Sequence, residues 1–464
     1  MIALSLRQIA EIAHGELHQC DPDTVVTSNF FFDSRAVIPG GIFIALQGEK
    51  VDGARFAESA IAQGAIAVLV DHPLTSPCIV VSDVLESLGL LAHYVRRAIP
   101  QLKVVGITGS QGKTTTKDLL THVLGAAGKT HSARGSYNND LGAPLTLLEC
   151  DESVKFCVVE MGARHPGDIA RLTKIAEPNI GVVLKVGNAH IGEFGSREKI
   201  AETKSELIRF LPPSATAILG TYDEFTPHMA DGLGLTTLTF GEDGADVRAA
   251  DIEWREGRAH FDLVTPAGRE PVGLRLVGVH QIANALATAA AATALQLPIE
   301  QIAAALSTAD NSSKWRMEMS DLDGLLVIND AYNANPESMA AALHTLALLS
   351  QERGGRSWAF LGTMHELGER STQEHQAIGS LAAELSIDHL VAIANTEYSR
   401  RMSGETEVHY CANIESAAEL FQHFQSGDVI LIKASRAEQL ERLAESIKVY
   451  WRTAHVTQSQ EGSE

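Results

Sequence analysis

A glycine-rich segment followed by lysine and threonines has the composition of a loop that holds phosphate groups. It is GITGSQGKTTTKDLL, residues 106–120, between the apolar run KVVGIT and a helical pattern. In such a loop, backbone N–H groups at the helix start bind phosphate oxygens, the lysine neutralises them, and a threonine hydroxyl binds Mg²⁺. Strict P-loop spacing would require glycine at Ile107, so this segment is a variant, and a glycine-rich turn without a ligand is the alternative. The predicted nucleotide-binding residues of the loop are Gly109, Ser110, Gln111, Gly112, Lys113, Thr114 and Thr115.

Two further polar residues follow apolar runs that are typical of buried strands. Glu160 ends the run FCVVE, and His190 ends IGVVLKVGNAH. Taken singly, each is an ordinary strand-end acid or loop histidine. Because the carboxyl ends of parallel strands meet at one edge of a sheet, we expect both to lie near Lys113. A carboxylate there would bind the metal ion that accompanies the nucleotide.

Lys204 lies in the predicted helix FGSREKIAETKSELI, one turn after Ile200 and one turn before Ile208. This position is close to an apolar face. An ammonium group there would be repelled by a nearby Mg²⁺. The residues alone therefore favour a lysine that extends along the surface to keep its charge in water.

The pattern of strands and helices predicts an α/β fold. Short apolar runs rich in β-branched residues alternate with helical segments from about residue 101 to 315, which indicates a parallel sheet covered by helices. After NSSKWRMEM the alternation restarts, which predicts a second, smaller sheet. Near the N-terminus, Ser5 and Gln8 form a predicted capping box. We expect three domains, at residues 1–100, 101–315 and 316–464.

Composition excludes several classes of protein. The chain has 464 residues, is 45% hydrophobic and carries a formal charge of −21, which disfavours binding to nucleic acid or anionic lipid. Five scattered cysteines without a CxxC pair indicate neither a disulfide framework nor a zinc site. No signal peptide or membrane span is predicted, since the longest apolar stretch, ANALATAAAATALQLPI, is typical of a packed helix. We expect a cytoplasmic protein, with no membrane insertion and no nucleic-acid partner.

These segments together resemble the Mur ligase family, in order and over nearly the whole chain. The resemblance implies an N-terminal domain that binds a UDP-linked substrate, a central P-loop-type ATP-binding domain and a Rossmann-like C-terminal domain. The segments that carry it are GITGSQGKTTTK, NNDLGAPLTLL, VVEMGARHPGDIA, GNAHIGEFGSREKIAETKSEL and INDAYNANPESMAAAL.

Within the family, the segments DAYNANPES and LGTMHELGE resemble those of the members that catalyse one particular reaction. It is the ATP-dependent ligation of D-alanyl-D-alanine to the carboxyl end of UDP-N-acetylmuramoyl-tripeptide, through an acyl phosphate, in peptidoglycan synthesis. The expected partners are these two substrates, and the expected state is a monomer. Alternatives are a Mur ligase that adds a single amino acid, a folylpolyglutamate-type synthetase, a non-catalytic homologue, or a nucleotide-dependent switch. The GTPase motif NKxD is absent, which disfavours the switch.

The resemblance also implies roles for individual residues. It implies that CO₂ carbamylates Lys204, which turns a cation into an anionic ligand of a second Mg²⁺. Catalytic roles are implied for Lys113, Glu160, His190 and Lys204, and metal binding for Thr114, Glu160, His190 and Lys204. Binding of the UDP end is implied for Asp33, Ser34 and Arg35, and of the sugar-peptide for Asn138 and Asn139. Further ATP contacts are implied for Asn284, Arg316, Asp330, Tyr332, Asn333 and Asn335.

Three positions depart from the family pattern. Trp315 stands where glycine is common before the arginine, Thr363 replaces an acid, and Ala434 replaces a glycine. No role is assigned to Thr363. The alanine is expected to matter only if its backbone requires a positive φ.

Overall fold

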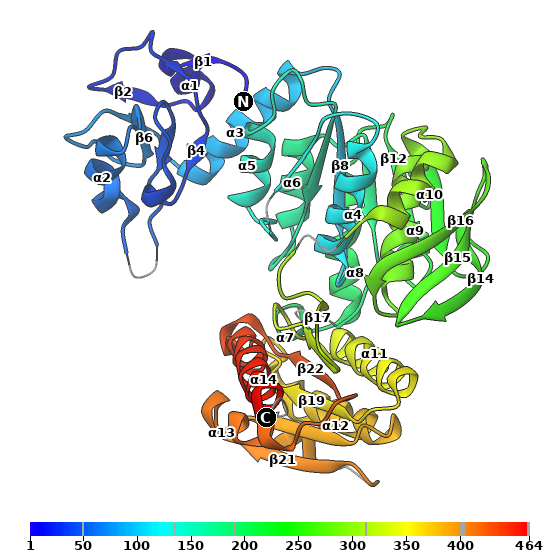
Figure 1. Cartoon of the computed structure of the whole chain (residues 1–464). Helices are drawn as coiled ribbons and strands as arrows, with labels where there is room; N and C mark the ends of the chain where they lie inside the picture. Colours follow the sequence, from blue (N-terminus) through cyan, green and yellow to red (C-terminus); the bar gives the residue numbers. More distant parts are fainter. Residues whose placement is uncertain (49–50, 134, 189–190, 311–312, 400–403, 462–464) are drawn as a thin grey trace.

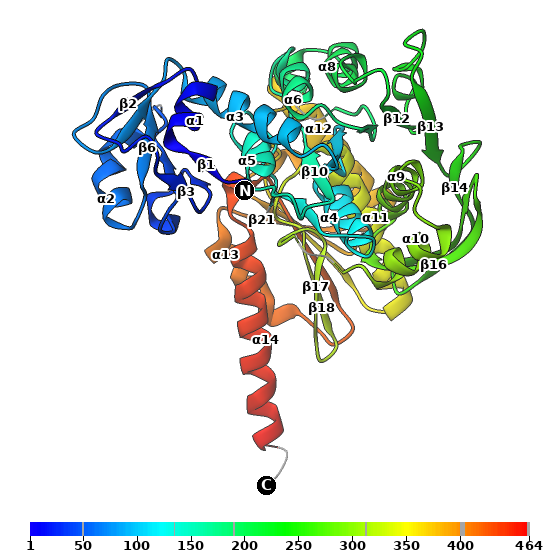
Figure 2. The ribbon, with the colours of Figure 1, turned by 90° about the horizontal axis from the view of Figure 1, so that it is seen from above.

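The structure is a computed structural model that describes residues 1–48, 51–133, 135–188, 191–310, 313–399 and 404–461. It has three parts in chain order, each built around its own sheet (Figure 1). The N-terminal part lies beside the central one, and the C-terminal part lies on another side of it (Figures 1 and 2). The predicted α/β fold class is confirmed.

The N-terminal part contains a five-stranded sheet in the order β2-β7-β6-β5-β4, in which only β2 is antiparallel to its neighbour. The predicted capping box is confirmed, since Ser5 Oγ accepts from Gln8 N at 3.2 Å and Gln8 Oε1 accepts from Ser5 N at 2.9 Å. The elements are β1 (Leu4–Ser5), α1 (Leu6–Ile12), β2 (Glu16–His18), β3 (Val25–Val26), β4 (Phe30–Phe31), η1 (Ser34–Ala36), β5 (Ile42–Ile44), η2 (Gly53–Phe56), α2 (Ala57–Ala62), β6 (Ala67–Val70), β7 (Cys78–Val80) and α3 (Val84–Ala98).

Helix α3 joins the N-terminal and central parts. It packs on α5 and α6 of the central part, and its buried residues Leu88, Leu91 and Val95 belong to one core shared by both parts. Near its end, Arg96 Nε donates to the carbonyl of Ala176 at 3.0 Å. The helix therefore fixes the N-terminal part against the sheet that carries the candidate site.

The central part contains a nine-stranded sheet in the order β16-β15-β14-β13-β12-β11-β8-β10-β9. Successive residues of β8 enter opposite cores, Val104 under α3, α5 and α6, and Val105 under α4 and α9. This double burial explains the continuous apolarity of the predicted strands. The elements are β8 (Lys103–Thr108), α4 (Lys113–Gly125), β9 (Thr130–Ser132), α5 (Gly142–Leu148), β10 (Phe156–Glu160), α6 (Asp168–Ala176), β11 (Ile180–Val183), α7 (Ile191–Phe194), α8 (Arg197–Arg209), β12 (Thr216–Gly220), η3 (Thr226–His228), β13 (Thr236–Gly241), β14 (Val247–Arg255), β15 (Arg258–Thr265), β16 (Gly268–Val277), α9 (Gln281–Ala294) and α10 (Ile299–Thr308).

The strands β14, β15 and β16 differ from the predicted alternation of strands and helices. They follow one another without an intervening helix and pair antiparallel. Residues of β15 alternate between intermediate and full burial, as in a sheet with one face toward solvent. The alanine-rich stretch forms the packed helix α9, as predicted. Within the described ranges, no helix is long and apolar enough to span a bilayer.

The C-terminal part contains a six-stranded sheet in the order β17-β18-β22-β19-β20-β21, parallel except for β17. The first half of helix α14 packs on this sheet, and its end extends away from the rest of the chain (Figure 2). The elements are β17 (Glu318–Leu322), β18 (Leu325–Asn329), α11 (Pro336–Arg353), β19 (Ser357–Leu361), η4 (Gly368–Arg370), α12 (Ser371–Glu384), β20 (His389–Ile393), η5 (Thr396–Ser399), β21 (Glu407–Cys411), α13 (Ile414–Ala418), η6 (Glu419–His423), β22 (Val429–Lys433), η7 (Arg436–Glu438) and α14 (Glu441–Glu461).

Candidate active site

A cavity of about 570 Å³ lies where the central and C-terminal parts meet, and both parts line it. It brings together most of the residues that the sequence predicts for a nucleotide and metal site. Gly109 belongs to the same loop but does not line the cavity. The predicted residues that do line it are Ser110, Gln111, Gly112, Lys113, Thr114, Thr115, Asn138, Asn139, Glu160, Lys204, Asn284, Arg316, Asp330, Tyr332, Asn333 and Asn335.

The glycine-rich loop runs from the end of β8 into helix α4, which begins at Lys113. Gly112 has φ of 80°, and a Cβ there would lie 2.3 Å from Asn284 Oδ1, so this position requires glycine. Lys113 Nζ donates to the carbonyl of Gly109 at 2.8 Å, which holds the side chain over the loop. Burial lowers the pKa of Lys113, and nearby Glu160 opposes this shift. The loop thus offers a fixed cation at a helix start.

Glu160 is the buried last residue of β10, and it forms the centre of a set of oxygen and amide groups. The register of parallel strands β8 and β10 places it beside Ile107, just before the loop. Glu160 Oε2 accepts from Thr114 Oγ1 at 2.9 Å, and Oε1 accepts from Asn138 Nδ2 at 2.7 Å. A carboxylate next to a threonine hydroxyl is a donor set that suits Mg²⁺.

Lys204 is buried on α8, with an exposed fraction of 7%, and it lines the same cavity. The interpretation as a surface lysine is therefore wrong, because α8 turns this residue inward rather than toward water. Burial lowers the pKa of Lys204 well below its usual value, and the charge of Lys113 lowers it further. Among the described residues, the amine has no hydrogen-bond or ion-pair partner. His190 lies outside the described residues, so its predicted role stays a prediction.

Arg316 extends from the C-terminal side of the cavity to the glycine-rich loop. Its NH2 group donates to Thr114 Oγ1 at 3.0 Å and to Ser136 Oγ at 2.9 Å. Its guanidinium carbon lies 4.1 Å from the centre of the Tyr332 ring. Arg316 therefore adds a second fixed positive charge close to Lys113.

The backbone on both sides of Arg316 is left-handed, with φ of 59° at Trp315 and 50° at Met317. Trp315 thus occupies a conformation that glycine adopts more easily, at the position where the family pattern has glycine. The Arg436 guanidinium lies 4.4 Å from the centre of the Trp315 ring, which supplies a contact that glycine could not make. At the other departure, Ala434 is absent from the described residues with positive φ, so it causes no strain of this kind.

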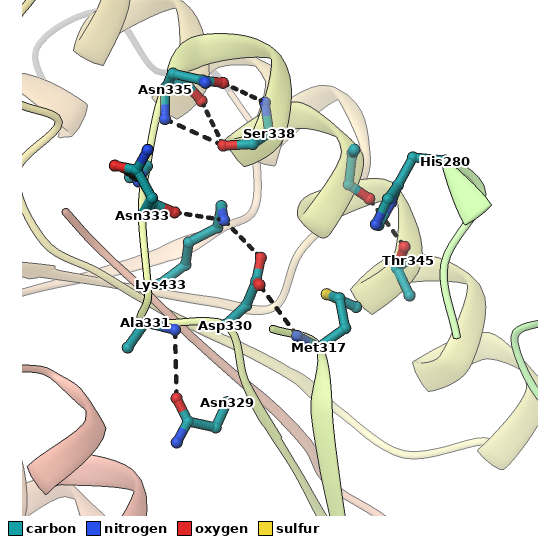
Figure 3. A network of polar contacts seen from close by, with 12 residues as sticks. His280, Met317, Asn329, Asp330, Ala331, Asn333, Asn335, Ser338, Thr345 and Lys433 are labelled. Atoms are coloured by element: carbon teal, nitrogen blue, oxygen red, sulfur yellow. Dashed lines mark hydrogen bonds and ion pairs between the residues drawn. The ribbon is translucent and has the colours of Figure 1, made fainter. Parts of the chain in front are cut away.

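Polar residues at the end of β22 and just after β18 form the C-terminal wall of the cavity (Figure 3). Lys433 Nζ donates to Asp330 Oδ2 at 2.5 Å and to the carbonyl of Asn333 at 2.9 Å. Asp330 Oδ1 also accepts from Met317 N at 3.0 Å, which ties this wall to the backbone beside Arg316. Asn335 caps α11, its Oδ1 accepting from Ser338 N at 2.9 Å.

Glu337 in the first turn of α11 connects the C-terminal part to the glycine-rich loop. Its Oε2 accepts from Gln111 Nε2 at 3.2 Å, and its Oε1 accepts from the backbone N–H of Asn188 at 2.6 Å. Gln111 Nε2 also donates to Asn335 Oδ1 at 3.2 Å. These contacts hold the start of α11 over the loop.

Replacing Glu337 with alanine is expected to raise the KM for ATP about tenfold with a smaller change in kcat, because two hydrogen bonds to a charged acceptor are lost. Steady-state assays of phosphate release at varied ATP measure this. Glu352 is exposed on the same helix, so Glu352→Ala is the matched control. An unchanged KM in Glu337→Ala would contradict the positioning role.

The predicted substrate residues fall into two groups. Asn138 and Asn139 line the cavity, whereas Asp33, Ser34 and Arg35 lie in the N-terminal part around η1. Asp33 accepts from Arg35 Nε at 2.9 Å, and this hydrogen bond lowers the pKa of Asp33.

An aromatic contact links the two segments that carry these substrate residues. The rings of Phe32 and Tyr137 lie 5.8 Å apart and nearly perpendicular, and each is adjacent in sequence to one of the predicted groups. The contact therefore places the segment around Arg35 next to the segment around Asn138, so that one extended substrate could touch both.

Several residues that line the cavity or contact the glycine-rich loop were not predicted as site residues. His280 and Gln281 precede Asn284 on α9, and burial lowers the pKa of His280 to about 4, so its ring is neutral at pH 7. Lys433 directly precedes Ala434 in the segment KASR, residues 433–436, and this lysine was the available signal. Ser136 and Glu337 carried no local signal, since both act on the loop from distant segments.

Comparison with known proteins gives three family matches along the chain. Residues 28–100 match the Mur ligase family catalytic domain, residues 107–292 the Mur ligase middle domain, and residues 315–436 the Mur ligase glutamate ligase domain. The chain is 39% identical to the UDP-N-acetylmuramoyl-tripeptide–D-alanyl-D-alanine ligase of Mycobacterium tuberculosis, over 96% of this chain and 98% of that protein.

Solved structures that are similar to this chain include ligases named MurF. A crystal structure of MurF from Acinetobacter baumannii is similar with a TM-score of 0.89 and 34% identity, over 97% of this chain and 99% of that one. MurF ligase from Thermotoga maritima, solved in complex with ADP, is similar with a TM-score of 0.80 and 30% identity, over 92% and 99% of the two chains.

Proposed function

Since this chain belongs to the Mur ligase family, we propose that it joins D-alanyl-D-alanine to the carboxyl end of UDP-N-acetylmuramoyl-tripeptide at the expense of ATP. The product is the UDP-linked pentapeptide that precedes peptidoglycan. The observation that carries the proposal is the cavity in which the Lys113 loop, Glu160 and buried Lys204 face Arg316 and Asp330. The relatives' shared name supplies the two substrates.

The first step brings two anions together. A carboxylate oxygen of the tripeptide attacks the γ-phosphorus of ATP, the bond to the β-γ bridging oxygen breaks, and ADP leaves with an acyl phosphate formed. Lys113 and Arg316, which line the cavity, would neutralise the phosphate oxygens, so the chain's own cations would reduce the repulsion. Mg²⁺, when bound, adds positive charge along the triphosphate.

The second step forms the amide bond. The amine of D-alanyl-D-alanine attacks the acyl carbon, a tetrahedral intermediate forms, the nitrogen loses a proton, and inorganic phosphate leaves. An acyl phosphate also reacts with water, so the site must exclude it. The contacts of Glu337 and Arg316 across the cavity support closure by the C-terminal part during this step.

Two metal sites are proposed from the donor set. Thr114 and Glu160 would hold one Mg²⁺, and Glu160, His190 and carbamylated Lys204 would hold the other. The lowered pKa of Lys204 supports the carbamate, because only the neutral amine attacks CO₂ and releases a proton as the carbamate forms. The new negative charge also removes the repulsion between this side chain and the metal.

The remaining proposals concern the substrate-binding residues, the domain bounds and the location of the protein in the cell. Asp33, Ser34 and Arg35 would bind the UDP end, and Asn138 and Asn139 the sugar-peptide. The three proposed domains keep residues 1–100, 101–315 and 316–464, and the chain is proposed to act in the cytoplasm as a monomer.

An acceptor screen tests the function. Phosphate release is measured with ATP, Mg²⁺ and UDP-N-acetylmuramoyl-tripeptide, and D-alanyl-D-alanine, L-lysine, diaminopimelate or glutamate is added in turn. We expect D-alanyl-D-alanine to give a rate roughly 10²-fold or more above any single amino acid, because a site built for a dipeptide leaves polar groups unpaired with a shorter acceptor. Faster release with a single amino acid would favour another ligase, and brisk release without any acceptor would contradict the scheme.

A further inference from the structure

Two histidines and a glutamate form a cluster on the C-terminal sheet, away from the candidate active site. His389 begins β20, and Glu407 and His409 lie on the neighbouring strand β21. The parallel register pairs His389 with Glu407 and Val391 with His409, so all three side chains project from one face. They lie near the amino ends of their strands, whereas the cavity residues Asp330 and Lys433 lie at the carboxyl ends of β18 and β22.

One ligand atom from each of the three residues lies within 4.8 Å of the other two, and the closest separations, which involve both carboxylate oxygens of Glu407, are those of a tetrahedral metal site. His389 Nδ1 lies 3.3 Å from His409 Nε2 and 3.3 Å from Glu407 Oε2, and His409 Nε2 lies 3.6 Å from Glu407 Oε1. Bonds of about 2.0–2.2 Å in a tetrahedron give ligand separations of about 3.3–3.6 Å. The cluster could therefore hold an ion without rearrangement of its strands.

The surroundings fix both imidazole rings in place. The Trp358 ring stacks on His389 with centres 3.7 Å apart and an interplanar angle of 17°. Trp358 itself is buried, and its Nε1 donates to Asp428 Oδ2 at 3.1 Å. The His389 and His409 side chains are only 11% and 20% exposed, whereas the Glu407 side chain is 63% exposed. One side of the cluster is thus rigid, and the other is open to an arriving ion and a water ligand.

We propose that His389, Glu407 and His409 bind a divalent transition-metal ion of the zinc class, with water as the fourth ligand. Two imidazoles select Zn²⁺, Ni²⁺ or Cu²⁺ over Mg²⁺, which prefers oxygen ligands. The ion would join β20 to β21, which is the edge strand of its sheet. An edge strand is paired on one side only. A metal bridge would add a second connection between β21 and the rest of the sheet. The site is separate from the proposed catalytic Mg²⁺.

Calorimetric titration of the full-length, chelator-treated chain with Zn²⁺, under saturating Mg²⁺, tests the site. We expect one Zn²⁺ per chain to bind in the wild type, with affinity at least about tenfold weaker in His409→Ala and in Glu407→Gln. His344 is exposed on α11, so His344→Ala is the matched control and is expected to bind Zn²⁺ as the wild type does. Unchanged affinity in both cluster variants would overturn the proposal.

Two further measurements guard against a folding defect and against binding elsewhere. Mg²⁺-dependent phosphate release by His409→Ala should stay near the wild-type rate, which shows that the variant is folded. Zn²⁺ should raise the Tm of the wild type and of His344→Ala but not of His409→Ala. An equal rise in Tm in all three would show that the ion binds at another site and would overturn the assignment.

Discussion

Replacing Lys204 with alanine is expected to reduce ligation by about 10³-fold, the upper range for loss of one fixed group that stabilises charge in the transition state. Lys204 is buried and lines the same cavity as Glu160 and Lys113, and alanine can form no carbamate there. The variant would lack an anionic ligand for the second metal ion. Steady-state phosphate release with all three substrates measures the loss.

Chemical rescue separates this role from a structural one. A small carboxylic acid, such as acetate, can enter the space left by the side chain and supply the missing negative charge. We expect it to restore part of the activity of Lys204→Ala and to leave the activity of the wild type unchanged. Lys199 is exposed on the same helix, so Lys199→Ala is the control and should keep full activity. Full activity in unrescued Lys204→Ala would refute the carbamate.

The segments that indicate the family and the fold could be recognised from the sequence because each is a pattern of neighbouring residues. The glycine-rich loop, the strand ending at Glu160 and the Asn335–Pro336 helix start each combine turn chemistry with apolar periodicity over fewer than about 20 residues. The family resemblance is confirmed by the three family matches and by the curated relatives. The α/β class followed from the same strands, whose double burial produces continuous apolar runs.

Features that depend on packing between distant segments could not be predicted in this way. The burial of Lys204 arises because α8 packs toward β8 and β11, while its own sequence allows a surface position. Ser136 and Glu337 contact the loop from about 20 and more than 200 residues away, with no local motif to reveal them. The antiparallel strands β14 to β16 lack the continuous apolar runs that indicate a parallel sheet, because one of their faces is more exposed.

Replacing Glu160 with glutamine is expected to reduce Mg²⁺-dependent ligation by about 10²–10³-fold and to raise the Mg²⁺ concentration needed for half-maximal rate. The carboxylate accepts from Thr114 and from Asn138, and an amide in its place presents a donor to one of them. The charge that is proposed to bind the ion is lost, while Lys113 and Arg316 remain. Mg²⁺ titration of phosphate release measures both effects.

A second measurement, the affinity for ATP without Mg²⁺, distinguishes a metal ligand from a structural residue by the direction in which the affinity changes. Without Mg²⁺, in a chelator, ATP should bind Glu160→Gln as tightly as it binds the wild type, or more tightly. The reason is that a negative charge has been removed beside Lys113, whose pKa it raises in the wild type. Glu152 is exposed in the loop before β10, so Glu152→Gln is the control and should match the wild type in both assays. Weaker ATP binding in the chelator would indicate a misfolded loop, and an unchanged Mg²⁺ dependence would remove Glu160 from the metal site.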